Sequence, residues 1–153
     1  MTIEVVPIAA AARDLPIFAS WLWMKWGQFR GRPPSRTLAY VTSWTAGQDL
    51  PFGYAAYLDG LPAGIAGVVR DDLEPRPDLT PWLASVFVRP DARGRGIASA
   101  LVEANADEAR RRGHTTLWLH TPDQQKLYAR LGWMADSQSI DLGEAVTVMR
   151  RAL

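Results

Sequence analysis

The chain has 153 residues, of which 48% are hydrophobic and seven are tryptophan, so residues 1–153 can form one domain with a substantial core but not two ordinary domains. Its 17 basic and 16 acidic side chains leave a net charge of +1, which excludes a general electrostatic attraction to nucleic acid or membrane. The lack of cysteine excludes a disulfide framework and a thiolate metal site, and two histidines are too few for a typical structural zinc, so no metal is expected.

The first third of the chain predicts a strand and two helices. Residues 2–7 suit a short strand, and Asp14 can cap a helix that ends at Gly27. The apolar residues of this helix share one face: Leu15, Phe18, Ala19, Leu22 and Trp26. After the break GRPPS, Ser35 can cap a second short helix that ends near Gly47.

The middle of the chain predicts three strands. Residues 51–58 and 61–70 form a hairpin around the turn pair Asp59-Gly60. Residues 82–88 are a continuous apolar run between two prolines, which is typical of a strand covered on both faces.

The last third alternates helix and strand. A helix runs to about Arg112, residues 115–120 form a strand, and residues 121–133 contain a short helix, with Thr121, Pro122 and Gln124 in the positions of a capping box. Residues 144–151 alternate as a closing strand does, so the order of elements predicts a mixed α/β domain.

The stretch RPDARGRGIASALV, residues 89–102, joins a buried strand to a helix through a glycine-rich turn. Such a turn leaves backbone N–H groups without partners at the positive end of the helix dipole, which favours an anion. Gly94 and Gly96 would let a diphosphate approach the backbone, and Arg93 and Arg95 add positive charge. The alternative is an ordinary turn with solvated arginines, and the stretch has neither a dinucleotide-binding G-x-G-x-x-G nor a P-loop ending.

The same residues resemble a known family. Arg93-x-x-Gly96-x-Ala98, after a strand that ends Val88-x-Pro90, is similar to the [QR]-x-x-G-x-[GA] acyl-CoA signature of the GNAT superfamily of N-acetyltransferases. Downstream, TTLWLHTPDQQKLYARLGW resembles the strand, helix and LYxxxGF segment of that family, with Trp133 in place of phenylalanine. The resemblance covers about residues 82 to 133 and implies a central mixed, mostly antiparallel sheet flanked by helices.

The resemblance also implies where acetyl-CoA binds. Residues Val86, Phe87 and Val88 match the strand that pairs with the pantetheine arm. The residues that match the pyrophosphate-binding loop and helix start are Arg93, Gly94, Arg95, Gly96, Ile97, Ala98 and Ser99. Thr121 stands where the family often has an asparagine that contacts the cofactor.

Two residues are candidates for proton transfer. Tyr128 matches the tyrosine that is thought to protonate the leaving thiolate; an isolated tyrosine here would instead pack in the core. Many relatives carry a glutamate base where this chain has Trp82. In ribosomal-protein alanine N-acetyltransferases the base is a glutamate that ends the next strand, and His120 follows the corresponding TLWL here. The alternative for His120 is a structural role, with its side chain hydrogen-bonded to backbone at the start of the last helix. His114 is expected to be a surface residue.

The acceptor is less defined. Six acids against two arginines give residues 49–78 a local charge of −4, which would attract a cationic amine unless they are merely solvated turn residues. The tryptophans of WLWMKWG either line an aromatic acceptor pocket or pack in the core. The expected acceptor is a primary amine of a small molecule, peptide N-terminus or lysine. The three arginines at positions 110–112 are favoured at the C-terminal end of a helix by the helix dipole, so their presence does not indicate nucleic-acid binding.

Two functions remain open from the sequence. The first is an acetyl-CoA-dependent N-acetyltransferase, and the second is a non-catalytic acyl-CoA-binding sensor or regulatory module, which needs no base. No apolar run approaches the roughly 20 residues of a membrane span, and MTIEVVPIAA lacks the basic region of a secretory signal, so we expect a cytoplasmic protein without a membrane partner. The oligomeric state stays open, with a homodimer as one option.

Overall fold

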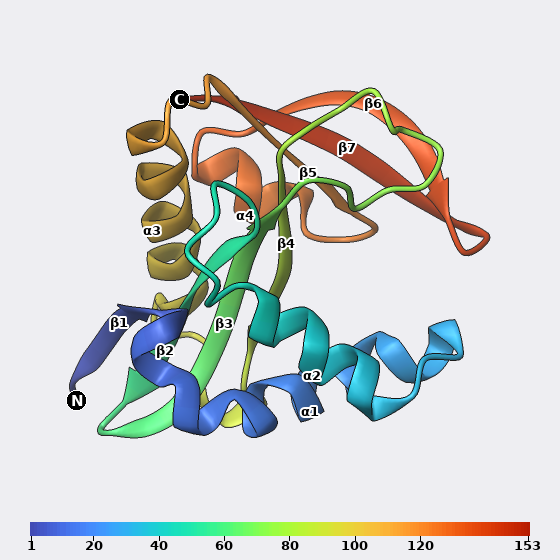
Figure 1. Cartoon of the computed structure of the whole chain (residues 1–153). Helices are drawn as coiled ribbons and strands as arrows, with labels where there is room; N and C mark the ends of the chain where they lie inside the picture. Colours follow the sequence, from blue (N-terminus) through green and yellow to red (C-terminus); the bar gives the residue numbers. More distant parts are fainter.

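The computed structural model describes residues 1–153 as one seven-stranded sheet with helices on both faces (Figure 1). In chain order, the helices and strands are β1 Ile3–Pro7, η1 Ile8–Asp14, α1 Leu15–Lys25, η2 Gly27–Arg30, α2 Pro34–Ser43, β2 Phe52–Leu58, β3 Leu61–Val69, β4 Trp82–Val88, η3 Pro90–Ala92, α3 Ile97–Arg111, β5 Thr116–Thr121, α4 Gln125–Arg130, β6 Met134–Asp141 and β7 Glu144–Ala152.

The strand order is β1-β2-β3-β4-β5-β7-β6, and every pair is antiparallel except β4 with β5. The β2–β3 hairpin turns at Asp59-Gly60, as predicted, and both residues have the positive φ that a tight hairpin of this twist requires. The predicted mixed, mostly antiparallel sheet with flanking helices is therefore confirmed.

Each face of the sheet has its own hydrophobic core. One core lies against α3 and α4 and includes Leu101, Leu117 and Tyr128. The other lies against α1 and α2 and includes Phe18, Val41 and Trp82. The predicted apolar face of α1 is confirmed, because Leu15, Phe18, Ala19 and Leu22 are all buried, while Trp26 is half-buried.

Both predicted helix caps in the first third are wrong. Asp14 precedes α1, but its side chain makes no capping bond and instead accepts a 2.6 Å hydrogen bond from the hydroxyl of Tyr57. Ser35 lies inside α2, which starts at Pro34 because the fixed φ of proline suits the first helical position. The helix ends at Ser43, before Gly47.

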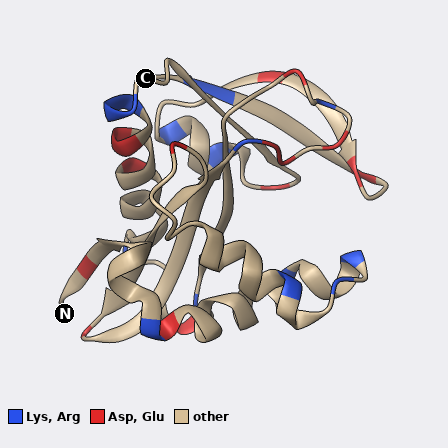
Figure 2. Ribbon diagram, viewed as in Figure 1, with Lys and Arg blue, Asp and Glu red and all other residues tan.

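The bounds of β6 were not predicted from the sequence. This strand lies at the edge of the sheet and is largely exposed, so it lacks the apolar run that marks β4. Figure 2 shows acidic and basic residues interspersed over the elements, with no face of one sign in that view. No helix has the length and apolar character that crossing a membrane requires.

Candidate active site

The sheet opens between its two parallel strands. Trp82 and Trp118 are the one pair of residues in register between β4 and β5, and Trp118 N donates a 3.0 Å hydrogen bond to the carbonyl of Pro81. Beyond this pair β5 continues along β7 while β4 continues along β3, so the two strands diverge (Figure 1). The backbone of β4 after Trp82 is therefore free of a strand partner on its β5 side.

A β-bulge lies in β4 next to this opening. Ile65 pairs with Phe87 but Gly67 pairs with Ala84, so two residues, Ser85 and Val86, lie opposite one on β3. Ser85 has a φ of 59°, which a non-glycine residue adopts rarely and which re-aims a strand locally. The predicted pantetheine-binding residues Val86, Phe87 and Val88 follow this bulge; the first two are half-buried and Val88 is buried.

Helix α2 approaches the bulge from one face. The hydroxyl of Tyr40 lies 3.5 Å from Oγ of Ser85. Burial raises the pKa of Tyr40, and the charge of Asp72 raises it further. Tyr40 therefore stays protonated throughout the neutral range and can serve as a hydrogen-bond donor on this side of the sheet.

The loop between β4 and α3 has the predicted geometry of an anion site. Gly94 and Gly96 have φ values of 78° and 80°, and a Cβ atom on either would meet nothing within 4 Å. No backbone N–H group from Gly94 to Ser99 donates a hydrogen bond within the protein. These groups open the 15-residue helix α3 at its positive end, so they can bind an anion without moving.

The arginines of this loop have separate partners. Arg93 donates from Nε to the carbonyl of Val88 at 2.9 Å, and its guanidinium lies 5.7 Å from the centre of the Phe87 ring. Arg95 is exposed and contacts Sδ of Met1 at 3.4 Å. Ile97 is buried against the sheet, while Ala98 and Ser99 are half-buried. The predicted anion site therefore consists more of backbone groups than of side chains.

Tyr128 lies in α4 on the α3 side of the sheet. Its ring is 7% exposed and packs edge-on to Trp133, with the ring centres 6.0 Å apart. The hydroxyl of Tyr128 makes no hydrogen bond within the protein and is not fully enclosed, so it is accessible to solvent. Burial raises the pKa of Tyr128 to about 12, and the charge of Asp123 acts in the same direction. Tyr128 is thus both part of the core and a protonated donor.

Thr121 ends β5 and caps the turn before α4. Its Oγ1 accepts hydrogen bonds from N of Gln124 at 3.0 Å and N of Asp123 at 3.4 Å. The predicted capping box is wrong, because α4 begins at Gln125 with Gln124 at its N-cap and has no side-chain capping bond. Thr121 instead closes the turn before the helix, and the side chain that bonds back toward it is that of Gln125. The contact of Thr121 with a cofactor stays a prediction.

His120 contacts a carboxylate that the sequence did not reveal, and the two form an ion pair when the imidazole is protonated. Its Nε2 lies 2.9 Å from Oδ2 of Asp72, which belongs to the connection between β3 and β4. Its ring packs edge-on to Trp82 at 5.8 Å, and Nδ1 is enclosed without a partner. Burial lowers the pKa of His120, but the contact with Asp72 and the charges of Asp72 and Asp141 outweigh it, so the net shift is upward. Burial raises the pKa of Asp72.

A second ion pair lies near the first. Arg30 of η2 lies 2.7 Å from Oδ2 of Asp141, at the end of β6, and both side chains are mostly buried. The charge of Asp141 raises the pKa of both His120 and Asp72, whereas Arg30 lowers that of Asp72. The segment after α1 and the β6–β7 hairpin therefore meet close to the His120–Asp72 pair.

The acids of residues 49–78 do not form one cluster. Asp49 lies 3.2 Å from Nε2 of His114, which is half-buried here and not a free surface residue. Asp59 accepts a hydrogen bond from N of Thr2, and Asp78 pairs with Arg76. Of the six acids that were expected to act together, Asp72 is the one whose carboxylate lies at the opening of the sheet.

The tryptophans of the segment WLWMKWG are half-buried, and Trp21 in α1 and Trp26 just after it pack against the core. Trp21 lies 5.7 Å from Phe87 between ring centres, and Trp26 lies 6.5 Å from it. A cavity of about 320 Å³ is lined by Trp21, Met24, Lys25, Phe87 and Pro90. This cavity borders the predicted pantetheine-binding strand, as the aromatic-pocket interpretation requires.

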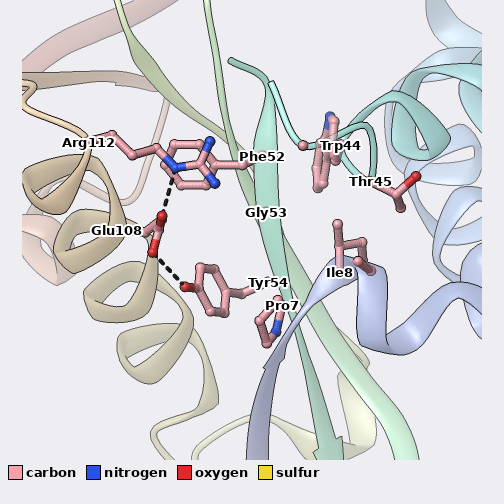
Figure 3. Close-up of a pocket in the computed structure, with 11 residues that line it drawn as sticks. Pro7, Ile8, Trp44, Thr45, Phe52, Gly53, Tyr54, Glu108 and Arg112 are labelled. Carbon is pink, nitrogen blue, oxygen red and sulfur yellow. Dashed lines mark hydrogen bonds and ion pairs between the residues drawn. The ribbon is translucent and has the colours of Figure 1, made fainter. Parts of the chain in front are cut away.

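A separate cavity of about 230 Å³ lies at the other end of α3, where Phe52, Gly53 and Tyr54 of β2 face Glu108 and Arg112 (Figure 3). Its charged side chains, Glu108 and Arg112, are paired with each other. Glu108 accepts from Tyr54 and Arg112, and Arg112 also donates to the carbonyls of Gln48 and Asp49. The basic residues at this helix end are therefore engaged within the protein, as are Arg110 with Asp107 and Arg111 with Glu108.

No group of three or more histidine, aspartate or glutamate side chains is arranged to hold a metal ion.

A sequence model of the family described as "Acetyltransferase (GNAT) family" matches residues 16–133. No curated protein sequence matches the chain. Solved structures share the fold: an aminoglycoside 6'-acetyltransferase type Ii is 17% identical, with 99% of this chain and 97% of that one covered and a TM-score of 0.74.

Two further structures have the same architecture. An aminoglycoside 6'-N-acetyltransferase complexed with coenzyme A is 15% identical, with 99% and 97% of the two chains covered and a TM-score of 0.73. A putative acetyltransferase of the GNAT family from Desulfovibrio desulfuricans is 16% identical, with 99% of each chain covered and a TM-score of 0.75.

Proposed function

The chain belongs to the GNAT acetyltransferase family and is an acyltransferase, and we propose that it transfers an acetyl group from acetyl-CoA to the primary amine of a cationic acceptor. The observation that carries this proposal is the convergence of three features at one opening of the sheet. These are the free backbone of β4, the unpaired N–H groups of Gly94 to Ser99, and the His120–Asp72 pair.

The residues present fit acetyl-CoA. Backbone N–H groups at the start of α3 suit a pyrophosphate, and the unpaired side of β4 at Val86 to Val88 suits the amide groups of a pantetheine arm. When bound, acetyl-CoA supplies an activated acyl group and a thiolate leaving group. Because Gly94 and Gly96 keep the loop open, the chain binds the diphosphate mainly through backbone.

His120 is the base of the proposed reaction. An alkylammonium has a pKa near that of lysine, about 10.4, so it must lose a proton before its nitrogen can attack a carbonyl carbon. Neutral imidazole accepts this proton at neutral pH, and the nearby carboxylate of Asp72 stabilises the imidazolium that results. Trp82 cannot replace His120, because it is fully buried and its Nε1 donates to the carbonyl of Leu79.

Tyr128 is the acid of the proposed reaction. With its pKa raised to about 12, its hydroxyl holds its proton at neutral pH until a strong base forms beside it. Its hydroxyl has no partner within the protein that would compete for the proton. The two proton-transfer groups lie on strand β5 and the helix that follows it, at His120 and Tyr128.

The acceptor binds on the α1–α2 side of the sheet in this proposal. The apolar cavity between Trp21 and Phe87 suits a hydrocarbon or aromatic part of a small molecule or peptide, and Asp72 suits its ammonium group. Two proteins of the same fold are aminoglycoside acetyltransferases, which makes an aminoglycoside one reasonable member of a test panel.

The test is a thiol-release assay with acetyl-CoA and a panel of simple amines, a polyamine, an aminoglycoside and peptides with free N-termini or lysines. We expect thiol release with at least one primary amine and none with its N-acetylated form. Gly96→Val serves as the matched inactive control because valine is strained at a φ of 80°, so the loop of the anion site must rearrange. If CoA binds and no amine supports thiol release, the acyl-CoA-binding module is the correct function instead.

A further inference from the structure

We propose that Asp72 is a catalytic residue that binds the acceptor's ammonium group and presents it to Nε2 of His120. The inference rests on the proposed acetylation of an amine and names the group that selects a cationic acceptor. It begins from the position of Asp72 in the connection between β3 and β4, beside the point where β4 and β5 diverge.

Asp72 is a mostly buried carboxylate without a permanent cation. Its side chain is 26% exposed, and no arginine or lysine pairs with it. The guanidinium of Arg30, which acts on Asp72 electrostatically, is held by Asp141 at 2.7 Å. A carboxylate removed from water is stable only when a positive group or hydrogen-bond donors replace its hydration, so this position favours a cationic ligand.

The other acids of the same region do not offer this environment. Asp71 and Glu74 are exposed to solvent, where a charge attracts a ligand weakly. Asp49, Asp59 and Asp78 are engaged by His114, Thr2 and Arg76, respectively. Asp49 also contacts a histidine, but its side chain is 56% exposed, against 26% for Asp72. Asp72 is therefore the mostly buried acid of residues 49–78 that lies next to a proton acceptor.

The geometry of the pair suits an ammonium group. Nε2 of His120 and Oδ2 of Asp72 are 2.9 Å apart, and Nδ1 is enclosed, so the imidazole meets a ligand through Nε2. An alkylammonium carries three N–H donors and can bond to the carboxylate and to Nε2 at the same time. In the neutral tautomer that carries its proton on Nδ1, Nε2 offers its lone pair; the N–H bond toward Nε2 then breaks, the proton moves to Nε2, and the amine keeps the electron pair that attacks the acyl carbon.

The charged and titratable groups around His120 come from four segments. They are Asp72 from the β3–β4 connection, Arg30 from η2, Asp141 from the end of β6 and Tyr40 from α2, whose pKa the charge of Asp72 raises. The charges of Arg30 and Asp141 largely cancel in their effect on His120, because the two side chains pair with each other. Asp72 is the member that contacts His120, so its removal has the largest effect on the imidazole.

The first experiment compares Asp72→Asn with Asp71→Asn, a neighbouring carboxylate that is exposed and does not contact His120. We expect the KM for the amine to rise about 10- to 100-fold in Asp72→Asn, as for the loss of a charged hydrogen bond, with the KM for acetyl-CoA unchanged. Asp71→Asn should match the wild type, and Asp72→Glu should recover most of the affinity. An unchanged amine KM in Asp72→Asn, or an equal effect of Asp71→Asn, overturns the proposal.

The second experiment does not depend on turnover. A proton NMR titration of the His120 ring in the free protein should give a lower pKa in Asp72→Asn than in the wild type, because the charge that favours imidazolium is gone. Saturating n-butylamine should lower the His120 pKa in the wild type but not in Asp72→Asn. A His120 pKa that Asp72→Asn or n-butylamine leaves unchanged overturns the role of Asp72. Failure of acetyl transfer with these shifts intact would instead count against the proposed reaction.

Discussion

Trp82 of β4 pairs with Trp118 of β5, and the two strands separate immediately beyond this pair. Trp82 is fully buried and its Nε1 donates a 2.7 Å hydrogen bond to the carbonyl of Leu79, so the point of separation is firmly held. A β-bulge at Ser85, further along β4, alters the course of this strand locally. In the proposed reaction, the cofactor, the acceptor and the proton-transfer groups meet in this opening.

Gly96→Val should abolish the rise in Tm that CoA produces in the wild type. Valine is strained at a φ of 80°, so the loop must rearrange and its N–H groups no longer converge on a diphosphate. The measurement is thermal denaturation with and without CoA. Arg93→Ala should weaken the shift less, since the backbone groups remain and the guanidinium is bonded to Val88.

The matched control is Gly143→Val in the β6–β7 turn, where φ is 79° and the space around a Cβ atom is equally open. This variant should lower Tm by a similar backbone strain yet keep the CoA-induced shift. A full shift in folded Gly96→Val would remove the loop from cofactor binding.

Tyr128→Phe should lower kcat by about 10²- to 10⁴-fold, because the ring is kept while the proton donor to the thiolate is lost. The dissociation constant for CoA should stay near that of the wild type. With the pKa of Tyr128 raised to about 12, this acid stays protonated between pH 6 and 9, so its ionisation should not lower kcat in that range. Steady-state kinetics and calorimetry supply both numbers.

Tyr54→Phe is the control for this substitution. Tyr54 donates to Glu108 at the far end of α3, away from the opening of the sheet, and its loss should leave kcat unchanged. Equal turnover of Tyr128→Phe and wild type would assign Tyr128 to packing alone.

His120→Gln should slow turnover and flatten the pH profile of kcat/KM. Only neutral imidazole accepts a proton, so activity rises as pH increases through the pKa of His120, which lies above 6.5 because Asp72 outweighs the effect of burial. Glutamine keeps a polar side chain at the end of β5 but has no basic nitrogen. The profile should be measured with two acceptors whose amines have different pKa values.

If the rise of kcat/KM with pH follows the pKa of the acceptor amine and His120→Gln turns over as fast as the wild type, the proton of the ammonium group leaves by another route. A limb at the same pH for both acceptors, lost in the variant, assigns it to His120.

Gly67→Ala should destabilise the fold by about 1–3 kcal/mol, because its Cβ would lie 2.7 Å from atoms of the Trp44 ring, which lies against β3. Urea denaturation measures the change. Adding Trp44→Leu should remove part of the penalty, and a penalty that persists in full would contradict the steric explanation.

The sequence by itself determined the elements whose cause is local. The β2–β3 hairpin follows from Asp59-Gly60, the buried face of α1 from its apolar spacing, and the loop at 93–99 from its glycines, since each depends on residues close together in the chain. The two helix caps predicted from neighbouring residues, Asp14 and Ser35, were wrong. The distant Tyr57 takes the carboxylate of Asp14, and α2 starts at Pro34.

Only the tertiary structure decided which side chains meet at the opening. Asp72 reaches His120, and Arg30 reaches Asp141, because strand order places β5 beside β4 and the β6–β7 hairpin near η2. Neither pair has a periodic or compositional signal, since its members come from segments far apart in the chain. The physical reason is that burial of both sheet faces sets the strand order, and that order then brings these charges together.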